Sequence, residues 1–105
     1  MIRHVVLMRV PQANLLNVSA TVQAIGALEG LGIQGFVASS NLTAEHRHQG
    51  YNYGFTLDFL DWPALERYQA HPEHQRQGAQ LLSALENPDQ DLLVFDMSCS
   101  ASTAA

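Results

Sequence analysis

The segment Tyr68–His74 reads Tyr-Gln-Ala-His-Pro-Glu-His and forms the joint around which the rest of the chain is organised. Proline fixes its own φ angle and offers no backbone N–H, so a single regular helix cannot run through this point. The pattern predicts one helix that carries Tyr68 and ends near His71. A second helix should then begin at once, with Pro72 in its first turn. We expect any chemistry of the chain at this joint, where one tyrosine and two histidines meet.

Both flanking helices have recognisable signals. Asp61 can cap the first helix, and Pro63 falls in its first turn. The second helix has one predicted buried side, and His74 is part of it. The residues on that side are His74, Gly78, Leu81 and Leu85. The residue before a proline is pushed out of helical geometry, so we expect His71 to be a cap or turn residue rather than a catalyst.

Four segments predict β-strands, and a ferredoxin-like α+β fold follows from their order. They are residues 2–10, 33–40, 51–60 and 91–98, with strict alternation of apolar and polar residues in 51–60. A helix is expected over residues 14–29, with Asn14 as its N-cap, and an exposed mobile connection over 41–50. The resulting order is βαββαβ, which places both helical segments on one face of a four-stranded antiparallel sheet.

The first and last strands are apolar on both faces, although the helices cover only one. Val5, Leu7, Leu92 and Val94 are the candidates for the uncovered side. Exposing four large side chains at roughly 1.5–3 kcal/mol each is costly for a domain that is stable by about 5–15 kcal/mol. The sequence therefore predicts a homodimer packed sheet to sheet. It leaves open which face of each strand lines the interface.

The composition limits which partners and which cellular location can be expected. The chain has 105 residues, a formal net charge of −5, five arginines and no lysine, which argues against nucleic acid and anionic membrane surfaces. No apolar run approaches the ~20 residues of a membrane span. A single cysteine excludes an intrachain disulfide and fits a cytoplasmic location. We expect one domain over residues 1–97 and a flexible tail over 98–105.

Four motifs, taken together, resemble the stress-responsive A/B barrel (Dabb) domain family, whose members are dimeric α+β barrels. The motifs are Ile-Arg-His-Val-Val-Leu-Met-Arg at 2–9, Gly-Tyr-Asn-Tyr-Gly-Phe-Thr-Leu-Asp-Phe at 50–59, Tyr-x-x-His-Pro-x-His at 68–74 and Leu-Leu-Val-Phe-Asp at 92–96. The resemblance covers residues 1–97 and implies the same dimer as the two-faced strands.

The functions of this family are diverse. One branch resembles a polyketide cyclase, in which the histidine matching His74 is the general base and the tyrosine matching Tyr68 assists it. A histidine matching His4 is retained here, whereas a pocket histidine of that branch is replaced by Tyr53. The resemblance thus implies a possible acid–base pair with a different pocket lining, and it does not carry over the substrate.

The candidate site consists of His74 and Tyr68 as catalytic residues, with His4, Tyr53 and Gly78 lining a ligand pocket. His74 suits proton transfer near neutral pH, and Gly78 leaves room for a ligand. The competing interpretation is a structural hydrogen bond between Tyr68 and His74 that locks the helix joint.

No metal site and no cofactor are predicted. A transition metal needs three or four convergent ligands. The pairs His71/His74 and His46/His48 lie in different elements, and nothing in the sequence forces them together.

Three functions therefore remain open. The first is a dimer that binds a small apolar ligand between helices and sheet without catalysis. The second is a cyclase or lyase acting on a carbonyl compound through His74 and Tyr68. The third is a monooxygenase of the dimeric α+β barrel type.

Overall fold

The computed structural model describes residues 1–99 of the chain. The elements follow in the order β1 (Ile2–Met8), η1 (Gln12–Asn14), α1 (Leu15–Gly26), β2 (Ile33–Ser40), β3 (Tyr53–Phe59), α2 (Trp62–Ala70), α3 (Pro72–Ser83), α4 (Pro88–Asp91) and β4 (Leu92–Ser98). This order confirms the predicted ferredoxin-like α+β fold, with the second helical segment divided between α2 and α3. Ser98, which fell both in the predicted strand 91–98 and in the expected tail, is the last residue of β4. The rest of the expected tail consists of Cys99, which the structure describes, and residues 100–105, which lie outside the described residues.

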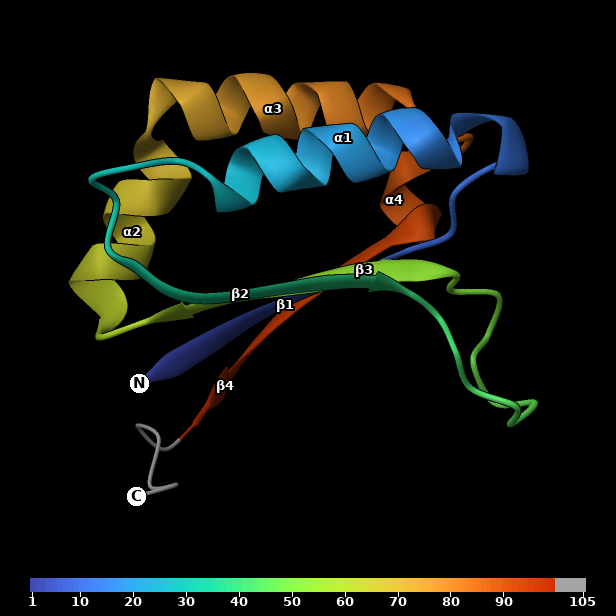
Figure 1. Ribbon diagram of the computed structural model, residues 1–105, viewed down its shortest axis with the longest axis horizontal. Coiled ribbons are helices and arrows are strands. Elements are labelled where there is room, and N and C mark those ends of the chain that lie inside the picture. Colours follow the sequence, from blue (N-terminus) through green and yellow to red (C-terminus); the bar gives the residue numbers. More distant parts are fainter. Residues whose placement is uncertain (100–105) are drawn as a thin grey trace.

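The sheet has the strand order β2-β3-β1-β4, with every neighbouring pair antiparallel. Helices α1 and α3 lie side by side over one face, α2 closes one end of that face, and the opposite face carries no helix (Figure 1). The core fills the space between helices and sheet, where Phe59, Leu57 and Leu65 are fully or almost fully buried. In the part of the chain that the structure describes, no helix combines the length and apolar character needed to cross a membrane.

The register of β4 corrects part of the predicted uncovered face. Val5 pairs with Phe95 and Leu7 with Leu93, and directly opposed residues of antiparallel strands point to the same face. Val5 and Leu7 therefore do lie on the uncovered side. The prediction for Leu92 and Val94 was wrong, since they share the helix-side face of the sheet. An unbroken apolar run shows no alternation, so the sequence does not indicate which of its residues face the helices and which face away.

Exposed apolar side chains on the uncovered face come from both edge strands. Val37 of β2 is 66% exposed, and Phe95 and Met97 of β4 are 47% and 48% exposed. Val5, from a central strand, is buried by its neighbours although no helix covers it. The apolar surface available to a second sheet is thus concentrated along the edges.

The helix joint is built as predicted. The Asp61 side chain accepts a hydrogen bond from the Ala64 backbone N–H at 3.0 Å and caps α2. His71 has an extended backbone, with φ −70° and ψ 133°, and its Nδ1 accepts from the Glu73 N–H at 3.1 Å. His71 is therefore the C-cap of α2 and the N-cap of α3, which confirms its expected role. Asn14 is the N-cap residue of α1, as predicted, but its side chain makes no capping hydrogen bond and instead donates to the Ala84 carbonyl at 2.9 Å.

Removing the α2 cap tests this local account. Asp61→Ala should lower the free energy of unfolding by about 1 kcal/mol, because the Ala64 N–H loses its partner. Glu66→Ala, a change of another exposed acidic residue of α2, should shift stability by less than about 0.5 kcal/mol. Urea unfolding of both variants measures the difference, and equal effects would contradict a capping role for Asp61.

Candidate functional site

A cleft opens between α3 and the β1–β4 half of the sheet, and we call it the helix-side cleft. Its volume is about 230 Å³. The residues that line it are His4, Val6, Tyr68, Gln69, His74, Gly78, Leu81, Leu82, Leu92 and Val94. At its mouth, Leu82 and Val94 are 41% and 46% exposed, so the cleft is open to solvent rather than closed. Mostly apolar walls with a few polar groups are typical of small-molecule sites.

His74 lines this cleft, and one nitrogen of its ring is buried. Because Pro72 starts α3, His74 lies in the first turn of that helix and on the side facing the sheet. Its Nδ1 is buried and has no hydrogen-bond partner among residues 1–99. Burial lowers the pKa of the imidazole below its ordinary value, with smaller contributions from the charges of His4 and His71. His74 is therefore neutral at pH 7 and can accept a proton.

Tyr68 reaches the cleft from the last turns of α2 and is only 1% exposed. Its ring lies 4.2 Å from the His74 ring and 5.1 Å from the Phe59 ring, centroid to centroid. The two site rings are tilted by 44°, and the described structure contains no hydrogen bond between them. The expected Tyr68–His74 hydrogen bond is thus replaced by ring packing. Burial raises the pKa of the Tyr68 phenol, so its hydroxyl stays protonated and can donate to a ligand.

A second imidazole faces the same cleft and has a carboxylate partner. His4 is 5% exposed, and its Nδ1 lies 2.7 Å from Oδ1 of Asp96, the residue opposite it on β4. When Nδ1 carries the proton and donates it to Asp96, Nε2 is the basic nitrogen of the neutral ring. The rings of His4 and Tyr68 are 5.9 Å apart, so Tyr68 contacts both imidazoles.

The structure brings together four of the five predicted site residues. His4, Tyr68, His74 and Gly78 all line the helix-side cleft. A Cβ atom added at Gly78 would meet nothing within 4 Å, so the space beside this glycine is open. Their roles toward a ligand remain predictions.

Tyr53 lies elsewhere. It pairs with Met8, whereas His4 pairs with Leu57, four residues further along the strand. At about 3.3 Å per residue, that separation is roughly 13 Å. The Tyr53 hydroxyl instead donates to Ser19 Oγ at 3.4 Å. Tyr53, which was expected to line the same ligand pocket as His4, therefore does not line the helix-side cleft.

Asp96 is the site residue to which the sequence assigned no role. Its position opposite His4 depends on the β1–β4 register. Within residues 1–99, no three His, Cys, Asp or Glu side chains are grouped so that they could hold a metal ion.

The fold and the cleft define a class, that of ferredoxin-like α+β domains with a polar site between helix and sheet. The stress responsive A/B barrel domain model matches residues 2–99. The chain therefore belongs to this family. A comparison with curated proteins gave no match.

Solved structures share this fold. A dimeric ferredoxin-like protein of unknown function from Jannaschia sp. CCS1 is 30% identical, with a TM-score of 0.80 over 93% of this chain and 98% of its own. An Arabidopsis thaliana protein, At3g17210, is 23% identical, with a TM-score of 0.80 over 98% and 99%. A hydroxynitrile lyase from Passiflora edulis is 15% identical, with a TM-score of 0.73 over 96% and 94%. The last two are similar in fold alone.

The burial of His74 predicts that the stability of the protein depends on pH. Its folded pKa is depressed, so the unfolded chain, where a histidine titrates near about 6.5, binds the proton more tightly. The stability contributed by neutral His74 is thus present at pH 7 and lost as the pH falls below about 6.5. NMR titration of the imidazole should give a midpoint below that value.

Urea unfolding at pH 7 and pH 5 provides the matching stability measurement. The loss of stability between these two values should be smaller in His74→Gln than in the unmodified protein. An equal loss in both proteins, or a His74 midpoint above about 6.5, would contradict a buried neutral imidazole.

Proposed function

We propose that this protein is a homodimer that binds a small, largely apolar carbonyl compound in the helix-side cleft, where His74 acts as a general base. The observation that carries the proposal is the buried Nδ1 of His74, which has no partner among the described residues and belongs to an imidazole that lines an apolar cleft. An unsatisfied buried polar atom costs about 1–3 kcal/mol. A ligand with a matching polar group would recover this cost.

The cleft limits the ligand to a small molecule. Its volume of about 230 Å³ is below the ~300–1,000 Å³ of pockets for drug-sized ligands. Apolar walls from Val6, Leu81 and Leu92 favour a hydrocarbon body. The polar lining consists of Gln69 and the rings of His4, Tyr68 and His74, and the Tyr68 ring contacts both imidazoles. A short alkyl or aromatic compound with one reactive carbonyl end fits this distribution.

The proposed chemistry is removal of a proton next to the carbonyl. Neutral His74 takes the proton from the α-carbon. The electron pair of that C–H bond forms a double bond to the carbonyl carbon, and the π pair of the carbonyl moves to its oxygen to give an enolate. The Tyr68 hydroxyl donates a hydrogen bond to the developing oxyanion. The enolate can then attack a second carbonyl, as in a cyclase.

Ligand binding without catalysis is the second candidate function, and His4 distinguishes the two. A binder needs a polar anchor, which His74 and Tyr68 already provide. The His4–Asp96 pair adds a second imidazole, held by a carboxylate in an arrangement that serves to orient catalytic bases. We therefore favour the acid–base enzyme, with His4 available to return or relay the proton.

Deuterium exchange tests the base directly. Hexan-2-one in D₂O should exchange its α-protons faster with the protein than in buffer, because background exchange at neutral pH is slow. His74→Gln should reduce the protein-dependent rate by about 100-fold or more. His46→Gln, the same change at an exposed loop histidine, should leave it unchanged. NMR integration of the α-proton signals gives the rates, and equal rates for the two variants would contradict the proposal.

The homodimer is tested separately at the uncovered sheet face. Val37 is 66% exposed there, so Val37→Asp should have little effect on the fold of one chain but place two charges in a sheet-to-sheet interface. Light scattering should give twice the chain mass of 11.5 kDa for the unmodified protein and the single-chain mass for the variant. Leu16→Asp, on the exposed side of α1, should remain dimeric. A single-chain mass for the unmodified protein would contradict the dimer.

A further inference from the structure

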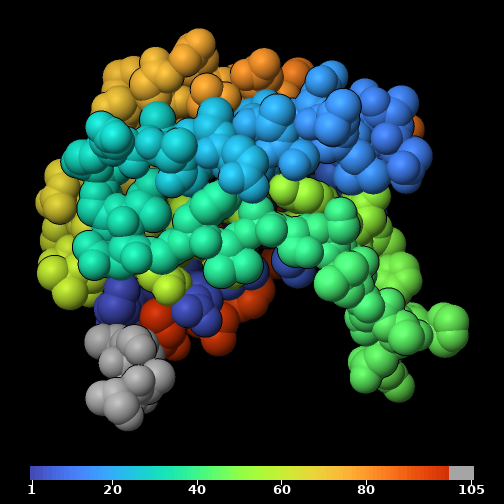
Figure 2. Space-filling model, viewed as in Figure 1, coloured from blue at the N-terminus to red at the C-terminus, as the bar shows by residue number. Residues whose placement is uncertain are grey.

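The connection between β2 and β3 projects from the molecule on the side of the sheet that carries no helix. Residues 41–50 are all exposed. The loop bends away from the helices (Figure 1) and, drawn in green, extends past the body of the chain (Figure 2). The proposed acid–base site lies on the opposite face of the sheet and makes no use of this loop.

Specific contacts hold the base of the loop. The Asn41 side chain donates to the Tyr51 carbonyl at 2.9 Å. Arg9 donates from Nε to the Gln49 carbonyl at 2.7 Å, and its guanidinium lies 4.4 Å from the centroid of the Tyr51 ring. Gln49 adopts the left-handed region with φ 56°. Ordering this exposed loop costs conformational entropy, and burial within the chain does not offset it.

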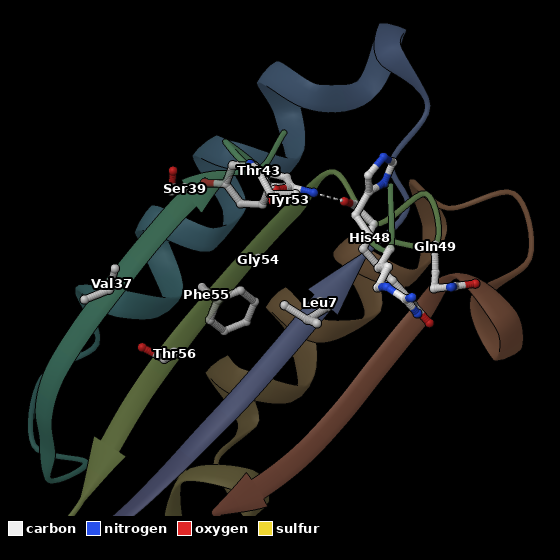
Figure 3. A pocket seen from close by; sticks show the side chains of 13 residues that line it. Leu7, Val37, Ser39, Thr43, His48, Gln49, Tyr53, Gly54, Phe55 and Thr56 are labelled. Atoms are coloured by element: carbon white, nitrogen blue, oxygen red, sulfur yellow. Dashed lines mark hydrogen bonds between the residues drawn. The ribbon is translucent and has the colours of Figure 1, made fainter. Parts of the chain in front are cut away.

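The loop and the uncovered sheet face border an open hollow of about 470 Å³, which we call the sheet-side hollow. Leu7 and Val37 of the sheet form its apolar floor, and Thr43 and His48 of the loop stand along one side (Figure 3). The hollow therefore continues the face that we propose for the second copy. Residues 41–50 would therefore lie beside any molecule that covers this face of the sheet.

We infer that residues 41–50 form an arm that packs against the second copy of the chain and buries Leu42 there. The inference rests on the proposed homodimer. Sheets packed face to face lie about 10 Å apart, and the loop extends beyond the face of its own sheet, so it must run beside the partner. The structure of the 30% identical Jannaschia protein is described as dimeric, which favours a second copy as the occupant. Leu42 is 88% exposed, the highest value among the large apolar side chains of residues 1–99.

Two leucine variants test the arm. Leu42→Ser should raise the dimer dissociation constant by about tenfold or more, because each dimer loses two buried leucine side chains. Leu16→Ser is the matched control, since Leu16 is 83% exposed but lies on α1, on the helix side of the sheet. Sedimentation equilibrium over a range of concentrations gives both constants. Leu16→Ser should have the same dissociation constant as the unmodified protein.

Trypsin cleavage after Arg47, an exposed residue of the loop, gives a second readout. In the unmodified protein, cleavage should become slower as rising concentration favours the dimer. In Val37→Asp, which should be monomeric, the rate should not depend on concentration.

The outcomes separate the two proposals. A dimer in which Leu42→Ser leaves the dissociation constant unchanged overturns the arm and leaves the homodimer intact. Cleavage after Arg47 that is equally fast in dimer and monomer also overturns the arm. An unmodified protein that stays monomeric at every concentration overturns both.

Discussion

The break in helical structure at Pro72 is the constraint on which the candidate site depends. Pro72 cannot continue α2, and His71 ends one helix and caps the next through its own imidazole. This geometry turns the chain so that Tyr68, near the end of α2, packs against His74, in the first turn of α3. A continuous helix would place positions six residues apart on different sides of the rod, since residues three, four and seven apart share one side. The tyrosine–histidine contact therefore follows from the proline.

The two faces of the sheet have different functions. The helix-covered face buries the core and leaves one opening beside α3, where polar groups meet among apolar side chains. The other face keeps apolar side chains of both edge strands exposed, with Val37 on β2 and Phe95 on β4. Because β1 contributes to both faces, alternate residues of one strand serve both tasks. His4 faces the cleft, and Val5, its neighbour in sequence, faces the surface proposed for association.

Much of the fold could be predicted from residues with strong local signals. The alternation in β3 predicts a strand with one buried face, and Pro72 predicts the helix joint. What could not be predicted depends on register. Residues 92–95 are all apolar, so the sequence does not indicate which of them face the helices. For the same reason, the hydrogen bond between Asp96 and His4 could not be predicted. Tyr53 was correctly expected on the buried face of its strand, but its distance along the sheet from His4 follows only from pairing.

The central claim is that the buried His74 nitrogen is kept free of protein partners in order to meet a carbonyl-derived ligand. A crystal structure of the protein soaked with cyclohexane-1,3-dione, a compound whose enol form mimics the proposed intermediate, tests this most directly. The account predicts the compound in the helix-side cleft, within hydrogen-bond distance of His74 Nδ1 and the Tyr68 hydroxyl. A compound bound elsewhere, or a His74 Nδ1 that hydrogen-bonds only to protein atoms while the cleft is filled by side chains, would contradict it.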